Sequence, residues 1–234
     1  MKKVTLWAWL LAAFPISLLA PAPGLAQVPA AGPGTGVNAA FVKLIGSVGP
    51  FTAKVETRVL DRAQNPLVRM PMDFSFLDGK VRLDIDLSKA ESKDFTPSIL
   101  ARLKQSGMDH FFSIFRPDRK VTLLVYPGVQ SYQELPQSPS ETEAAEKGLK
   151  VEKTGLGKEV LEGHPCTKSK VTVKGSKGTV LNAVAWNATD LKDFPILVEM
   201  KEDDKTVRMH FTDVRFVKPD AKQFEVPAGY GRIE

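Results

Sequence analysis

The chain has 234 residues, 25% of them charged, with a formal net charge of +5 at pH 7 and a single cysteine. So small a net charge, spread along the whole chain, argues against a nucleic-acid-binding protein, because such proteins concentrate basic residues in patches. One cysteine excludes an internal disulfide, so a packed core must stabilise the fold.

The first 26 residues have the pattern of a secretory signal peptide. Lys2 and Lys3 give a positive start, residues 4–20 are almost continuously apolar, and small residues lead up to Ala26. This order predicts export, with cleavage between Ala26 and Gln27. An uncleaved anchor is the alternative, but prolines interrupt a stretch that would need about 20 apolar residues to span a membrane. Because Gln27 offers no thiol for lipidation, we expect a periplasmic or secreted protein that does not span a membrane after cleavage.

Cleavage leaves 208 residues, of which 30 are basic and 27 acidic, enough chain for one domain with its own core. Residues 27–38 are mainly Gly, Pro and Ala, a composition that predicts a disordered leader. Residues 39–234 are expected to form a single β domain. An exposed connection is expected near 136–148, where Pro, Ser and Glu replace large apolar residues.

The clearest strand patterns lie in the first half of the domain. Apolar and polar side chains alternate between residues 51 and 59, which predicts a strand with one buried side. Residues 72–87 form two alternating runs around Asp78 and Gly79, a pair that favours the positive φ angles of a tight hairpin turn. Asp84 and Asp86 fall on the polar side of this hairpin and are expected to face solvent.

One helix is expected after the hairpin, because Thr96 suits its cap, Pro97 its first position and Gly107 its end. Further strands are expected over residues 110–115, 121–126, 158–161, 167–174, 180–186, 196–200 and 207–217. Their spacing, with no long helices between them, predicts a meandering antiparallel sheet. One or two helices cannot cover the apolar face of such a sheet, so we expect the sheet to curl.

No recognisable catalytic or metal-binding motif is present. His110, His164 and His210 stand outside any known nucleophile, phosphate-loop or zinc-protease pattern. His164 and Cys166 are the best metal-ligand candidates, but a structural zinc site needs four ligands and a catalytic site three. We therefore expect no catalytic residue, no metal site and no cofactor, and Cys166 is expected to be a small buried side chain.

Four lysines, Lys168, Lys170, Lys174 and Lys177, surround one predicted hairpin. Lysines on an edge strand prevent aggregation between sheets, which is the simpler interpretation. A docking patch for an acidic partner or an anionic lipid is the alternative.

Several segments together resemble a known family. They are residues 76–84, 116–121, 157–168 with the Gly163-His164-Pro165-Cys166 turn, 186–191, and the closing Phe224-Glu225-Val226-Pro227-Ala228-Gly229-Tyr230. Over about residues 40–232 the chain resembles the periplasmic LolA-like superfamily of outer-membrane lipoprotein-sorting carriers, in an uncharacterised branch. The resemblance implies a mainly β fold with few helices. In this fold a strongly curved antiparallel sheet forms an incomplete barrel around one to three helices. The resemblance also implies that the sheet encloses an apolar space for acyl chains.

We therefore expect a non-enzymatic exported protein that binds an acyl chain, a lipid or a lipoprotein inside a curved sheet. The expected lining residues are large and fall on the expected inner face, and they are Phe74, Phe76, Val81, Leu83, Ile85, Phe111, Phe115, Leu123 and Trp186. Ordinary core packing is the alternative role for each of them. An envelope protein-protein interaction module without a lipid ligand is the second hypothesis, and an enzyme with a histidine beside a carboxylate in a cleft is the third.

Overall fold

The computed structural model describes residues 37–139, 142–143, 146, 148–175, 178–202 and 204–233. Its strands are β1 (Phe51–Leu60), β2 (Pro66–Leu77), β3 (Lys80–Asp86), β4 (Glu91–Ser92), β5 (His110–Arg116), β6 (Val121–Tyr126), β7 (Ser131–Pro136), β8 (Lys150–Leu161), β9 (His164–Gly175), β10 (Gly178–Ala188), β11 (Phe194–Glu202), β12 (Lys205–Arg215) and β13 (Gly231–Ile233). The α-helices are α1 (Val37–Ile45) and α2 (Pro97–Gln105). Short 3₁₀ helices are η2 (Gly46–Val48), η3 (Leu87–Lys89), η4 (Pro127–Val129) and η5 (Ala221–Phe224).

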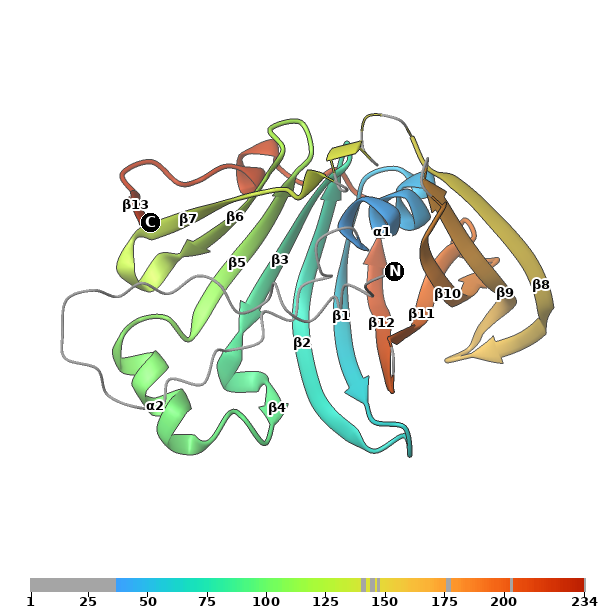
Figure 1. Ribbon diagram of the computed structural model, residues 1–234, viewed down its shortest axis with the longest axis horizontal. Helices are drawn as coiled ribbons and strands as arrows, with labels where there is room; N and C mark the ends of the chain where they lie inside the picture. Colours follow the sequence, from blue (N-terminus) through green and yellow to red (C-terminus); the bar gives the residue numbers. More distant parts are fainter. Residues whose placement is uncertain are drawn as a thin grey trace.

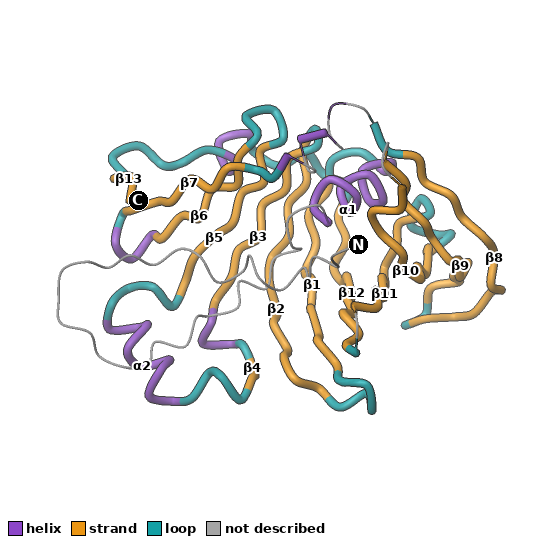
Figure 2. The backbone as a smooth tube through the Cα atoms, in the orientation of Figure 1, coloured by secondary structure: helices purple, strands orange, loops and turns teal. Residues whose placement is uncertain are grey.

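All strands belong to one sheet, in the order β13-β7-β6-β5-β3-β2-β1-β12-β11-β10-β9-β8, with β4 beside β2. Neighbouring strands are antiparallel except β13, which runs parallel to β7. The sheet bends strongly around α1, and its two ends, β13 and β8, lie far apart (Figures 1 and 2). This arrangement confirms the predicted mainly β fold with few helices and a curved antiparallel sheet that does not close into a barrel.

Helix α1 defines the concave face of the sheet. The ring of Phe41 stacks on Phe211 with centroids 6.2 Å apart and meets the edge of Phe74 at 6.5 Å. Phe51 in turn packs against Phe74 and, at 4.8 Å, against Phe194. These aromatic contacts join α1 to the concave side of β1, β2, β11 and β12, and the main core continues from there across β3 and β5.

The first hairpin and the helix form as their local sequences predict. Asp78 and Gly79 have φ angles of 50° and 80° between β2 and β3, the left-handed values that a tight turn requires. Thr96 accepts a hydrogen bond from the Ile99 amide at 3.4 Å, and the chain leaves α2 through Gly107, whose φ is +70°.

Other elements differ from the sequence-based expectation. Helix α1 begins at Val37, inside the range 27–38 predicted as a leader, because its apolar residues pack against the sheet rather than face solvent. Strand β7 was not expected, and β8 begins eight residues before the predicted strand 158–161. Residues 1–36, including the predicted signal peptide, and part of the 136–148 connection lie outside the described residues.

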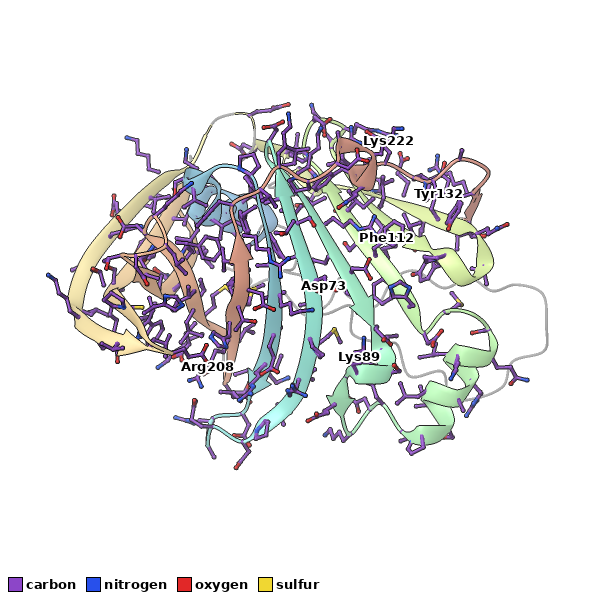
Figure 3. The ribbon with its side chains drawn as sticks, turned by 180° about the vertical axis from the view of Figure 1, so that it is seen from behind. Asp73, Lys89, Phe112, Tyr132, Arg208 and Lys222 are labelled. Atoms are coloured by element: carbon purple, nitrogen blue, oxygen red, sulfur yellow. The ribbon has the colours of Figure 1, made fainter. Side chains whose placement is uncertain are left out.

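A second apolar cluster lies on the convex face of the sheet, and we call it the convex cluster. It contains Leu77, Phe112, Ile114, Val121, Leu123, Val125 and Phe224, with Tyr132, Val226 and Tyr230 packed against it. The C-terminal segment 219–230 thus covers the convex side of β5 and β6. Figure 3 shows Phe112 and Tyr132 on this side, with Lys222 of the covering segment near them.

Two arginines fasten the C-terminal segment to the sheet. Buried Arg116 donates to the Phe224 carbonyl at 2.9 Å and pairs with Glu225 at 2.6 Å. Arg82 donates to the Gln223 carbonyl at 2.9 Å. Arg116 also binds both carboxylate oxygens of Asp118 at 2.9 and 2.8 Å, a two-point geometry that fixes the guanidinium plane.

The Arg116–Asp118 pair predicts a stability that depends on pH. Hydrogen bonds from Arg116 hold the pKa of Asp118 below its ordinary range. The unfolded chain therefore binds more protons in acid, so the pair stabilises the fold above the ordinary carboxyl pKa and this contribution is lost as pH falls through the lowered value. Below about pH 4, urea titrations should show the free energy of unfolding falling more steeply for the parent than for Asp118→Asn. Parallel curves would contradict this assignment.

Candidate functional site

The strand register brings a continuous set of side chains to the concave side of β3, β5, β6 and β7, and we call it the β3–β7 concave face. It consists of Val81, Leu83, Ile85, Phe111, Ser113, Phe115, Thr122, Leu124, Tyr126, Ser131, Gln133 and Leu135. None of these positions carries a charge. The charged side chains of these strands, such as Arg82, Asp84 and Glu134, alternate onto the convex side. The charged side chains of this half of the sheet therefore all lie on its convex side.

Burial varies across the β3–β7 concave face. One row of paired residues crosses the strands from Leu83 through Ser113 and Leu124 to Gln133. Leu83 is buried, whereas the other three are half-buried. Phe111 and Tyr126 lie to one side of this row, in ring contact at 5.8 Å, and burial raises the pKa of Tyr126. The face is thus uncharged, with apolar and neutral polar side chains, and is partly accessible to solvent along its centre.

Seven of the nine predicted lining residues share the concave side. Phe74 and Phe76 lie on β2 and pair with Leu83 and Val81 of β3, and Ile85 and Val81 pair with Phe111 and Phe115 of β5. All seven are less than 10% exposed. The structure therefore brings them together as one apolar surface, with Phe74 and Phe76 under α1 and η2 and the others beyond them.

Leu123 does not line the concave side, and that expectation is wrong. Leu123 pairs with Ile114 and belongs to the convex cluster under Phe224. Both sides of β6 are apolar, because the C-terminal segment covers the side that would otherwise face solvent. A period-two pattern identifies such a strand but cannot assign its faces.

Trp186 is also placed on the other side of the sheet. The β9–β10 register puts it with Lys168 and Val184, opposite to Ala185. Its indole nitrogen donates to Glu159, and the Lys168 ammonium lies 4.5 Å from the centre of its ring. Long side chains of β8 and β9 cover the Trp186 ring, and Trp186 also belongs to the main core cluster at this end of the sheet.

The three histidines each pair with a different carboxylate, and His110 pairs with Asp84. His164 Nδ1 lies 2.8 Å from Asp190 Oδ2, and His210 Nε2 lies 3.1 Å from Glu162 Oε2 without hydrogen-bond geometry. Among the described residues, no group of three histidine, cysteine or acidic side chains could hold a metal ion. Burial raises the pKa of the Cys166 thiol, the opposite of what a nucleophilic thiolate requires.

Asp84 contacts both Arg82 and His110 on the convex side. It accepts hydrogen bonds from Arg82 at 2.9 Å and from His110 at 2.5 Å, and the Arg82 guanidinium lies 3.8 Å from the centre of the Phe112 ring. Burial acts to raise the pKa of Asp84, but these two partners outweigh burial and lower it. Asp84 and Asp86 do lie on the outward side, as predicted, where Asp84 is half-buried in this network.

None of the helices within the described ranges is both long and apolar enough to cross a membrane. No protein-family model matches the chain, and no curated protein matches its sequence. Solved structures do match. A LolA superfamily protein from Nitrosomonas europaea aligns with a TM-score of 0.41 and 8% identity, over 81% of this chain and 94% of that chain.

Two mycobacterial proteins are similar to the same extent. Lipoprotein LppX from Mycobacterium tuberculosis has a TM-score of 0.42 and 10% identity, over 78% of this chain and 97% of that chain. LprF from Mycobacterium bovis has a TM-score of 0.41 and 12% identity, over 83% of this chain and 98% of that chain. The first of these three structures is a LolA superfamily protein, and LolA-like proteins are the family that the sequence resembles. The function proposed below rests on the geometry of this chain alone.

Proposed function

We propose that this chain is an exported, non-enzymatic protein that binds an apolar ligand against the β3–β7 concave face. The ligand is an acyl chain, free or as part of a lipid or a lipoprotein. One observation carries the proposal: the concave surface of four strands has no charged side chain, and half-buried residues lie along its centre. Helix α1 packs over the other half of the sheet.

The chemistry of this face suits a long flexible hydrocarbon. Aliphatic and aromatic side chains supply apolar area, and burying each methylene of a ligand against them contributes about 0.8 kcal/mol. The hydroxyl and amide groups of Ser113, Gln133 and Thr122 stand between them as neutral hydrogen-bonding groups. Such a face offers no charged anchor, so we expect recognition of hydrocarbon rather than of a particular headgroup.

A bulky side chain at the centre of this row should block binding. We expect Ser113→Phe to displace two or three ligand methylenes, which weakens binding of a fluorescent fatty acid by about 2 kcal/mol, or about 30-fold. The matched control is Ser75→Phe, because Ser75 is half-buried on the convex side of β2 opposite Arg82. Leu124→Gln, which changes polarity rather than volume, should also weaken binding. Equal affinity in all four proteins would contradict the proposal.

Export and ligand are tested together on protein purified from its native envelope. Intact mass should correspond to a chain that begins at Gln27, and an organic extract should contain acyl lipid. A chain that retains residues 1–26 would refute the proposed cleavage. Protein that carries no lipid and fails to bind the fluorescent fatty acid would refute the proposed ligand.

A further inference from the structure

The last strand of the sheet, β8, presents a long open edge. It has 12 residues and pairs with β9 on one side, and no described strand pairs with its other side. It forms the outermost strand at the end of the sheet opposite β13 (Figure 1). Nearly all of it is exposed, including Leu156 at 52% and Val160 at 71%. An edge of this kind has free backbone donors and acceptors that can pair with an added strand.

The charges of β8 are unbalanced. Glu152 pairs with Lys174 at 2.7 Å, and Glu159 pairs with Lys168 at 3.3 Å, so β9 neutralises both carboxylates. The three lysines of β8, Lys150, Lys153 and Lys158, are exposed, and no ion pair joins them to a carboxylate in the described part of the chain. The edge is therefore positive, with apolar side chains between its charges.

The register shows on which side these lysines stand. Lys153 pairs with Val171, a concave-side residue of β9. A bulge between Gly155 and Gly157 shifts the register by one residue, so Lys158 pairs with Thr167 on the same side. Lys153 and Lys158 thus lie on one side of the strand, with Val160 beside them. An added strand would meet two ammonium groups and an exposed valine on that side.

We propose that the β8 edge binds an extended acidic segment of another protein as an additional strand. The backbone of β8 supplies the hydrogen bonds, and carboxylates of the segment pair with Lys153 and Lys158. This site lies at the opposite end of the sheet from β7 and is independent of the apolar ligand proposed above.

In the register that pairs all 12 residues of both strands, a second copy of this chain fits the edge poorly. Antiparallel pairing of two β8 strands that sets Val151 opposite Val160 also sets Lys153 opposite Lys158 and Glu152 opposite Glu159. Like charges directly opposite each other destabilise a strand pair. An acidic segment instead satisfies both lysines.

Two labelled ten-residue peptides, one alternating Glu and Val and one alternating Lys and Val, test the proposal by fluorescence anisotropy at low salt. The acidic peptide should bind the full chain and slow amide hydrogen exchange in residues 150–161, and added salt should weaken it. The pair Lys153→Glu with Lys158→Glu should weaken it at least tenfold. Lys93→Glu, at an exposed lysine before α2, is the control and should leave binding unchanged.

The following results would contradict binding of an acidic segment at the β8 edge. Binding of both peptides with equal affinity, or protection outside residues 150–161, would overturn the proposal. If the lysines act only against aggregation between sheet edges, neither peptide binds. A dimer in sedimentation that dissociates on charge reversal would assign the edge to a second copy and also overturn it.

Discussion

Replacing Phe224 with alanine is expected to lower the free energy of unfolding by about 4 kcal/mol. Phe224 is 0% exposed and lies in the convex cluster, which covers the outer sides of β5 and β6. Removing its ring leaves a cavity against Phe112, Ile114 and Leu123. The C-terminal segment is then attached to the sheet mainly through its hydrogen bonds from Arg82 and Arg116.

Urea unfolding followed by circular dichroism measures this effect. Lys222→Ala is the control, because Lys222 is exposed in the same short helix η5, and it should change the free energy of unfolding by less than about 0.5 kcal/mol. A loss below about 1 kcal/mol for Phe224→Ala would mean that the C-terminal segment does not stabilise the sheet.

Gly128→Ala is expected to cost about 3 kcal/mol, the next largest effect. A Cβ atom at Gly128 would lie 2.3 Å from the Gly107 carbonyl oxygen and 2.8 Å from the Gly107 Cα. Both of these neighbouring atoms belong to the backbone, which cannot rotate away as a side chain can. Either η4 or the end of α2 must therefore shift to make room for the added methyl group. Gly107 has a φ of +70° and cannot easily take another conformation to make room.

The control for this substitution is Gly155→Ala. A Cβ atom at Gly155 has no neighbour within 4 Å, and its φ lies outside the left-handed region. Thermal unfolding should show a Tm several degrees lower for Gly128→Ala than for Gly155→Ala. Equal Tm values would show that α2 does not depend on the Gly107–Gly128 contact.

Local patterns predicted the elements whose stability is local. The Asp78-Gly79 turn and the Thr96 cap are encoded by a few adjacent residues, and both form where the sequence placed them. The alternation of residues 51–59 likewise became β1, since one of its sides is buried. In each case, residues close together in the sequence are sufficient to specify the element.

Elements that depend on distant partners were missed. Helix α1 packs its Phe41 ring on Phe74 and Phe211, which no local motif could reveal. Most of β8 is exposed and alternates poorly, so backbone pairing with β9 holds it in place rather than burial. The basic strand β9 was expected to be an edge, but β8 pairs outside it, while Lys177 lies outside the described residues.

The candidate site was predicted in composition and only partly in position. Five of the seven lining residues on the concave side lie on β2 and β3, where a period-two pattern assigns faces correctly because the other face is polar. Phe111 and Phe115 share that side although the other face of β5 is apolar. That rule fails for Leu123, because both faces of β6 are apolar. It also fails for Trp186, which the register places opposite to Ala185 and whose ring contacts Lys168 and Glu159.

Methyl NMR during titration with a fatty acid tests the central claim most directly, because it distinguishes the two faces of the same strands. We predict shifts of the methyl signals of Leu83, Ile85 and Leu124 on the β3–β7 concave face, and unchanged signals from Leu123 and Val125 of the convex cluster. Shifts confined to Leu123 and Val125, or no shift at any of the five residues, would contradict an apolar ligand site inside the curved sheet.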